Sequence, residues 1–229
     1  MSNNKSNKFD QITVNAEAIE QLVTAANNHE EETQALLLKL EKDVADLPSA
    51  ISLPDEQPAI ALREFVVEYI NHVPSFIAAV AFAARDAGIN EYVEPFLEVA
   101  KNFFLEPVNK DSTEGSLEEL MQQAYLSHRL IEEVNDQYIV RAGIPLIPME
   151  MTKANIIVHQ LVGETLANSL DEVVEETARQ MTSKDSVYGS ERFKEYVETR
   201  KGPGWDMVWK QWSDMTNSLA IDLDFKQSK

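Results

Sequence analysis

The sequence predicts an all-α protein: a multi-helix bundle with long antiparallel helices and a C-terminal helical hairpin. Apolar residues recur at spacings of three and four along most of the chain, which is typical of amphipathic helices. Alternation of apolar and polar residues, the pattern of a strand, does not recur, and only 7 of the 229 residues are glycine. A hydrophobic fraction of 44% is sufficient for a buried core.

Composition divides the chain into three predicted parts. Residues 1–14 are polar, and we expect a disordered N-terminal tail. Residues 15–182 should form an acidic helical bundle, and residues 1–182 together carry the whole net charge of −19. Residues 183–229 hold eight basic and eight acidic residues, so they form a neutral helical appendage, packed on the bundle or on a partner.

The first helix is expected from residue 15 to about residue 47, with one uninterrupted apolar seam along it. A second helix should start within "PDEQPAIALREF", break or kink at Pro74 and end at Gly88, and its buried face should include Tyr69. A third helix should begin near Asn90 and end before Pro107. The expected seam of the first helix is Ile19, Leu22, Ala26, His29, Thr33, Leu36, Leu40 and Leu47.

The clearest helix start is Ser116, because Ser116 and Glu119 fit the S-x-x-E capping box. That helix should run to Arg141 and end at Gly143. "IPLIPM" then has two prolines too close together for a helix, and we expect a buried or covered, extended connector there.

Three further helices are expected: a long one near 150–181, and two short ones near 190–200 and 204–220, separated by "KGPGW". All three tryptophans lie in the last. Trp205, Trp209, Trp212 and Met215 form one stripe, which we expect to dock on the bundle or to form an interface with a partner or a second copy of the chain.

Composition and missing motifs exclude several classes of function. The chain has no cysteine, so disulfides and thiolate chemistry are excluded. The net charge of −19 argues against direct binding to nucleic acid or to an anionic membrane. The most apolar stretch, residues 73–84, is too short to span a bilayer, and no secretory signal is visible, so we expect a soluble cytoplasmic protein. Phosphate-binding and hydrolase motifs are absent, and no catalytic residue is assigned.

Three histidines raise the question of a metal site. His128, Glu132 and Asp136 share one face of their helix, and we expect His128 at the boundary with solvent. His159 lies at the centre of an apolar stripe, and we expect it to be buried, either as a neutral core residue or as a ligand. His72 follows Glu68 by one helical turn.

A helical bundle could bring these groups together around iron, manganese or zinc. The candidate ligands are His159, His128, His72, Glu68 and Glu132. However, the Glu-x-x-His motif of di-metal bundles is absent.

Three functions therefore remain open. The first is a protein-interaction or adaptor role, as part of a hetero-complex or a homo-oligomer. The second is a non-haem metal-binding bundle. The third is an acidic mimic of nucleic acid that occupies the basic site of a DNA-binding protein.

Overall fold

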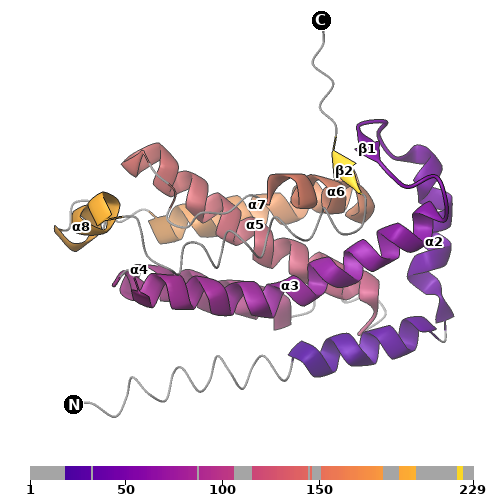
Figure 1. Cartoon of the computed structure of the whole chain (residues 1–229), viewed down its shortest axis with the longest axis horizontal. Helices are drawn as coiled ribbons and strands as arrows, with labels where there is room; N and C mark the ends of the chain where they lie inside the picture. Colours follow the sequence, from indigo (N-terminus) through magenta and orange to yellow (C-terminus); the bar gives the residue numbers. More distant parts are fainter. Residues whose placement is uncertain are drawn as a thin grey trace, which may run out of the picture.

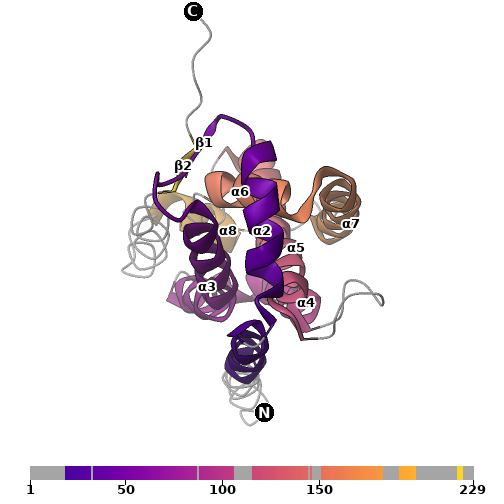
Figure 2. The ribbon, with the colours of Figure 1, turned by 90° about the vertical axis from the view of Figure 1, so that its right-hand side faces the viewer.

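The computed structural model describes residues 19–31, 33–86, 88–105, 115–143, 145, 151–182, 191–199 and 221–223. These residues form an all-α bundle, as the sequence predicts, with one short pair of strands at its edge (Figure 1). The long helices α3, α4, α5 and α7 lie along the length of the molecule, and α2 crosses one end of them (Figure 2).

The centre of the bundle is α5, Leu117–Ala142, which packs against α3, α4, α6 and α7. Helix α3, Pro58–Asp86, runs on through Pro74, and α4 covers Asn90–Leu105. Proline opens α3, where its missing N–H has no helical partner to lose. The predicted inner face of α3 is confirmed as buried: Leu62, Phe65, Val66, Tyr69, Ile70 and Val73.

Helix α3 is also long and apolar enough over Pro58–Phe82 to cross a membrane, judged by length and composition alone. Half of that window is buried inside the protein, as in the core helices of soluble proteins, which meet the same criteria. The prediction from the sequence considered only residues 73–84, the most apolar stretch, which the charged Arg85 and Asp86 follow.

The predicted start and end of α5 are confirmed. The backbone N–H of Glu119 donates to the Ser116 hydroxyl over 3.1 Å, and the Glu119 carboxylate accepts from the N–H of Gly115 over 2.7 Å. Gly143 ends the helix in the left-handed region at φ 74°, which glycine adopts without steric cost.

The single helix expected over 15–47 is wrong. Residues 19–31 are helical, but Gln34 adopts a left-handed φ of 51°, and a separate helix, α2, covers Ala35–Asp43. The buried Glu30 carboxylate makes this break stable, since it accepts the backbone N–H groups of Leu36 and Leu37, each over 3.0 Å.

The expected seam changes with the break. Val23 and Glu30 are buried, whereas Leu22 is exposed and His29 only half-buried. A 3₁₀ turn, Val44–Asp46, then ends the segment.

The long helix expected near 150–181 is two helices, α6 over Thr152–Val162 and α7 over Glu164–Thr182. Gly163 separates them with φ 93° and ψ 138°, which no helix contains. Because the chain changes direction at Gly163, the helical phase of α6 cannot be extended into α7.

A small antiparallel sheet joins distant parts of the chain. Strand β1, Ile51–Ser52, pairs with β2, Asp222–Leu223, and β2 also contacts α6. No strand was expected from the sequence, because a strand of two residues is too short to show an alternation of apolar and polar residues. The short helix α8, Glu191–Thr199, matches the expected helix near 190–200.

Several predictions lie outside the described residues: the N-terminal tail 1–14, most of the connector 144–149, and the helix 204–220 with the stripe Trp205, Trp209, Trp212 and Met215. The C-terminal helical hairpin, in which this last helix would pair with α8, therefore stays a prediction.

Candidate functional site

A polar cluster that joins several helices is centred on Arg129 of α5. Its Nη1 donates to Glu132 Oε2 over 2.6 Å, and its Nε donates to Asp171 Oδ1 on α7 over 3.0 Å. A third carboxylate, that of Glu133, lies 4.0 Å from Nη2. The Arg129 side chain is only 18% exposed, so these contacts form in partly desolvated surroundings.

Glu132 extends the cluster to α6 and α3. Its Oε2 accepts from Asn155 Nδ2 over 2.6 Å, and its Oε1 accepts from the Thr152 hydroxyl over 2.8 Å. The amide oxygen of Asn155 in turn accepts the hydroxyl of Tyr69 on α3 over 2.7 Å. One carboxylate therefore links three helices, and each of its oxygens has a donor.

Asp171 extends the cluster along α7. Its two oxygens lie 2.9 and 3.1 Å from the hydroxyl of Tyr125, which donates to them. His159 Nε2 lies 3.7 Å from Asp171 Oδ2 and 3.2 Å from Asn168 Oδ1. We call the whole set the Arg129 network: Tyr69, Tyr125, Arg129, Glu132, Thr152, Asn155, His159, Asn168 and Asp171.

Charge and burial shape the pKa values of the network. Burial alone would lower the pKa of Arg129, but attraction to Glu132, together with hydrogen bonds to Glu132 and Asp171, raises it above its ordinary value. Burial raises the pKa of Tyr125, and the charge of Asp171 raises it further. Arg129 thus stays charged and Tyr125 stays neutral at physiological pH.

The position of His128 contradicts the prediction. Its side chain is fully buried rather than at the boundary with solvent. Its Nε2 lies 3.1 Å from the carbonyl oxygen of Tyr69, and its ring meets the Tyr69 ring edge-on with centroids 4.5 Å apart. Burial lowers the pKa of His128 to about 3, partly offset by the Tyr69 carbonyl, so the ring is neutral at physiological pH.

The position of His159 contradicts the prediction in the opposite sense. It was expected at the centre of a buried stripe, but its side chain is 21% exposed. The predicted stripe continues through Gly163, so it requires α6 and α7 to be one continuous helix. The break at Gly163 means that residues before and after it do not share one helical face. Ala154, Ile157, Val158 and Leu161 form the buried side of α6 instead.

The prediction that His128 lies at the boundary with solvent failed for a different reason. α5 has neighbours on almost every side, since it contacts α3, α4, α6 and α7. A polar residue on such a helix can be buried on the face that would meet solvent in a surface helix. Ser127, Gln122, Gln123 and Asn135 of α5 are buried in the same way.

The five candidate metal ligands do not converge in the described structure. Glu132 is occupied by the Arg129 network, His128 packs among aromatic rings, and Glu68 is exposed. His72 is near enough to His128 to lower its pKa slightly. Within the residues that the structure describes, no group of three or more His, Asp or Glu side chains is arranged to hold a metal ion.

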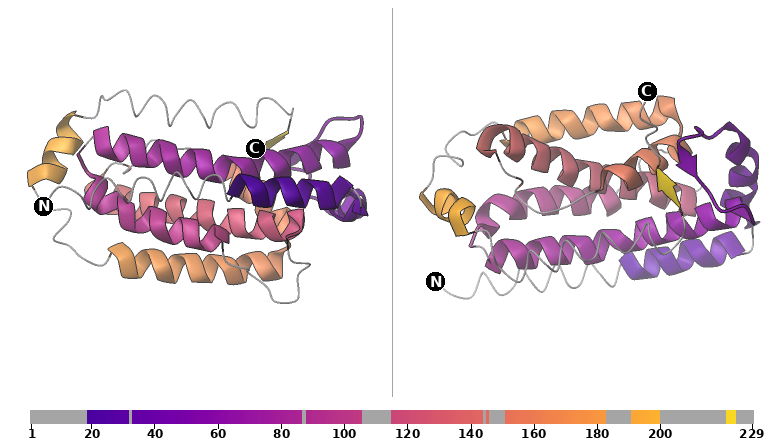
Figure 3. Two further views of the ribbon diagram at one scale, coloured as in Figure 1. Left: turned by 90° about the horizontal axis from the view of Figure 1, so that it is seen from below. Right: turned by 45° about the horizontal axis from the view of Figure 1, so that its top comes forward.

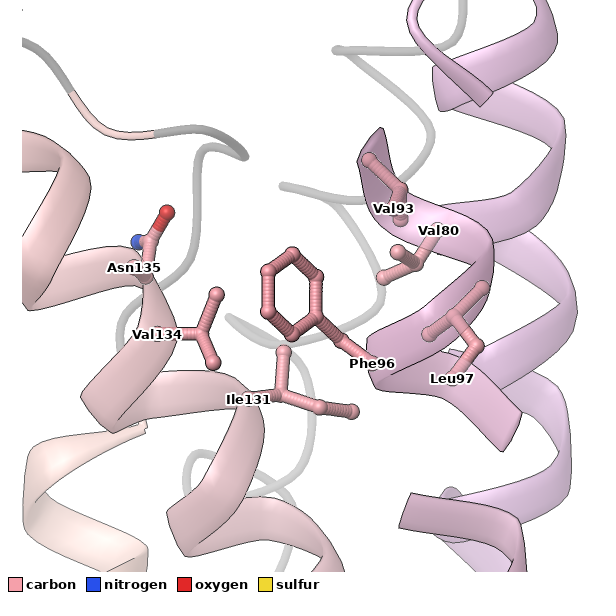
Figure 4. Close-up of a pocket in the computed structure, with 7 residues that line it drawn as sticks. All are labelled: Val80, Val93, Phe96, Leu97, Ile131, Val134 and Asn135. Atoms are coloured by element: carbon pink, nitrogen blue, oxygen red, sulfur yellow. The ribbon is translucent and has the colours of Figure 1, made fainter. Parts of the chain in front are cut away.

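A small cavity lies between α3, α4 and α5 (Figure 4). Its volume of about 10 Å³ is at the lower limit for one water molecule. Valine, leucine, isoleucine and phenylalanine side chains line it, with Asn135 as its polar member. This is a packing defect rather than a ligand site.

Most of the Arg129 network was not predicted from the sequence. Glu132 and His159 were expected as candidate ligands and Tyr69 as a buried residue, but neither Arg129 nor Asp171 was singled out. The spacing of Arg129 and Glu132 by three residues was a visible signal, since such pairs meet on a helix. That Asp171 joins them could not be read from the chain, because 42 residues separate it from Arg129.

Comparison of this chain with protein-family models, with curated proteins and with solved structures finds no match.

Proposed function

We propose that this protein is an interaction module that binds a basic protein partner through the outer face of α7. The observation that carries the proposal is the division of α7 into two faces. Its inner face packs on α5 through Ala167, Leu170, Val174 and Ala178. Its outer face presents carboxylates around an exposed apolar residue.

The outer face carries excess negative charge. Asp171 is bound by Arg129 and Tyr125, and Glu176 pairs with Arg179 on the same helix. Glu164, Glu172 and Glu175 are exposed, and no salt bridge to them occurs within the described residues. Basic groups of a partner could pair with these carboxylates without displacing internal ones.

An apolar residue lies within this acidic surface. Val173 is 47% exposed, between Glu172 and the Glu175–Glu176 pair along the helix. Apolar centres surrounded by polar residues are common at protein interfaces, where the charged rim mainly increases the association rate. The net charge of −19 would attract a basic partner over a longer range.

Site-specific photo-crosslinking tests the proposal. A photoreactive amino acid at Val173 should give a discrete adduct in cells, whereas the same group at Leu38, half-exposed on α2, should not. Glu172→Gln with Glu175→Gln should abolish the adduct. The matched double variant Glu31→Gln with Glu41→Gln removes two exposed acids elsewhere and should preserve it. Equal adducts from positions 173 and 38 would contradict the proposal.

The nucleic-acid mimic is a special case of the same surface. A DNA-binding protein is one class of basic partner, and duplex DNA would compete with α7 for its site. If duplex DNA that is added before irradiation prevents the adduct at position 173, the partner is such a protein. If the adduct still forms, the partner binds α7 with a surface that does not bind DNA.

Metal binding is the second hypothesis, and the pair His159 and Asp171 is the arrangement that favours it most. Elemental analysis of protein purified without a metal-affinity tag tests it directly. A stoichiometric metal that is lost in His159→Ala would support it. A metal retained in that variant would show that the ion is bound elsewhere.

A further inference from the structure

The bend between the helix over residues 19–31, which we call the N-terminal helix, and α2 centres on Gln34. The backbone N–H of Gln34 donates to the Glu30 carbonyl over 2.7 Å, and the Gln34 carbonyl accepts the N–H of Leu38 over 2.9 Å. Both are bonds that a continuous α-helix would also contain. Gln34 itself lies in the left-handed region, with φ 51° and ψ 27°. Rotation of this one residue is therefore the main change that would straighten the bend.

Side chains replace the helical hydrogen bonds that the bend removes. In a continuous helix, the N–H groups of Ala35, Leu36 and Leu37 would donate to carbonyls four residues earlier. In the bent form, the Glu30 carboxylate accepts from Leu36 and Leu37, each over 3.0 Å. The Thr33 hydroxyl accepts from Ala35 over 3.4 Å. Each of the three N–H groups thus has an acceptor in either form.

The local sequence suits a straight helix better than a bend. No glycine or proline lies between residues 19 and 43, and the predicted seam from Ile19 to Leu40 keeps its three-and-four spacing across the bend. A glutamine is strained in the left-handed region, whereas it is a good helix former. Two arrangements therefore compete here: a bend that the Glu30 carboxylate supports, and a continuous helix that local propensity supports.

The N-terminal helix covers apolar surface of its own bundle. Figure 3 shows it lengthwise beside α3, and its residues Ile19, Val23 and Ala26 belong to the hydrophobic core. A continuous helix would carry it away from this surface. The uncovered core side chains would then need an equivalent helix, and a second copy of the chain supplies one of the same shape and sequence.

We propose that two copies of this chain exchange their N-terminal helices by straightening at Gln34. Each N-terminal helix then occupies the surface that the other has left, so both chains recover the same apolar contacts. Short connections under strain favour exchange of this kind. The inference is independent of the proposed function, which concerns the outer face of α7.

Charge opposes the exchange at low ionic strength. Each copy carries a net charge of −19, so two copies repel each other. At about 1 M salt the Debye length falls to about 3 Å, and this repulsion is largely screened. We therefore expect a monomer in dilute protein at low salt, and a rising share of dimer when protein and salt concentrations are both raised.

Sedimentation at about 1 M salt measures the association constant of the dimer. Glu30→Gln leaves one of the two N–H groups without an acceptor in the bend, and it should raise the constant at least about tenfold. Gln34→Gly relieves the left-handed strain and weakens the continuous helix, and it should lower the constant at least about tenfold. Glu31→Gln, at the exposed acid beside Glu30, is the matched control and should keep the natural value. Equal constants in all three variants would overturn the proposal.

A distance between two spin labels shows whether the dimer contains the straight helix. The chain has no cysteine, so Glu20→Cys with Lys42→Cys places labels at two exposed sites on either side of the bend. Along a continuous helix these positions are about 33 Å apart, and the bend shortens that separation. Labelled chain is diluted with unlabelled chain, so that only distances within one chain are measured. We expect the longer distance in the dimer and the shorter one in the monomer. A dimer that keeps the monomer distance would show that another surface forms it, and the proposal would be wrong.

Discussion

Helices α5 and α7 each carry five acidic residues, but they use them differently. On α5, Glu118 pairs with Lys39, Glu119 caps its own helix, and Glu132 binds Arg129. On α7, Asp171 alone is drawn into the protein, and most of the other acids face solvent. α5 packs against α3, α4, α6 and α7, whereas among the described elements α7 packs mainly on α5 and α6.

This difference shows that composition does not determine what an acidic residue does. Acids of a central helix must find donors, since burying an unpaired charge costs several kcal/mol. Acids of a peripheral helix are hydrated and remain available to a partner. The same residue type therefore supports the fold on α5 and is open to interaction on α7.

Arg129→Met should have the largest effect, because it leaves Glu132 and Asp171 partly buried without their positive partner. We expect a loss of about 3 kcal/mol in the free energy of unfolding, near the lower end for breaking a buried ion pair. Urea denaturation at pH 7 measures it. The control is Arg179→Met, on the exposed side of α7, which should change stability by less than about 0.5 kcal/mol. Similar losses in both variants would remove the distinction between the two helices.

The pH dependence of stability should report the burial of the His128 ring. The folded-state pKa of His128 is lowered to about 3, below its ordinary value of 6.5, so unfolding takes up a proton between these values. Its contribution to stability is complete above pH 6.5 and falls by about 1.4 kcal/mol per pH unit below it, or roughly 2–3 kcal/mol by pH 4.5.

Urea titrations at pH 6.5, 5.5 and 4.5 test this prediction. His128→Gln should show a shallower loss of stability with acid than the natural protein. Parallel curves for His128→Gln and the natural protein would show that His128 is not the buried neutral group.

The two adjacent valines of α7 give the smallest effect, and they test its two faces directly. Val174 is fully buried, so Val174→Ala removes two buried methyl groups and should cost about 2 kcal/mol. Val173→Ala should be neutral or stabilise by up to about 0.5 kcal/mol, because alanine has the higher helix propensity. Thermal unfolding of both variants measures the difference. A cost for Val173→Ala equal to that for Val174→Ala would show that the outer face is covered.

The sequence by itself determined the fold class, the capped start of α5 and the buried face of α3. These features depend on interactions within a few residues of each other: the Ser116–Glu119 box, the left-handed Gly143, and the helical spacing from Leu62 to Val73. Local geometry is the same whatever packs around it, so spacing alone predicts it.

Only the tertiary structure decided which polar residues are inside. The burial of His128 depends on the helices around α5, and the exposure of His159 depends on the turn at Gly163. The break at Gln34 is held by Glu30 from the preceding helix, and Arg129 finds Asp171 across 42 residues. Contacts with residues distant in sequence determine these positions. A buried charge or a strained backbone is stable only where the rest of the chain supplies its partners.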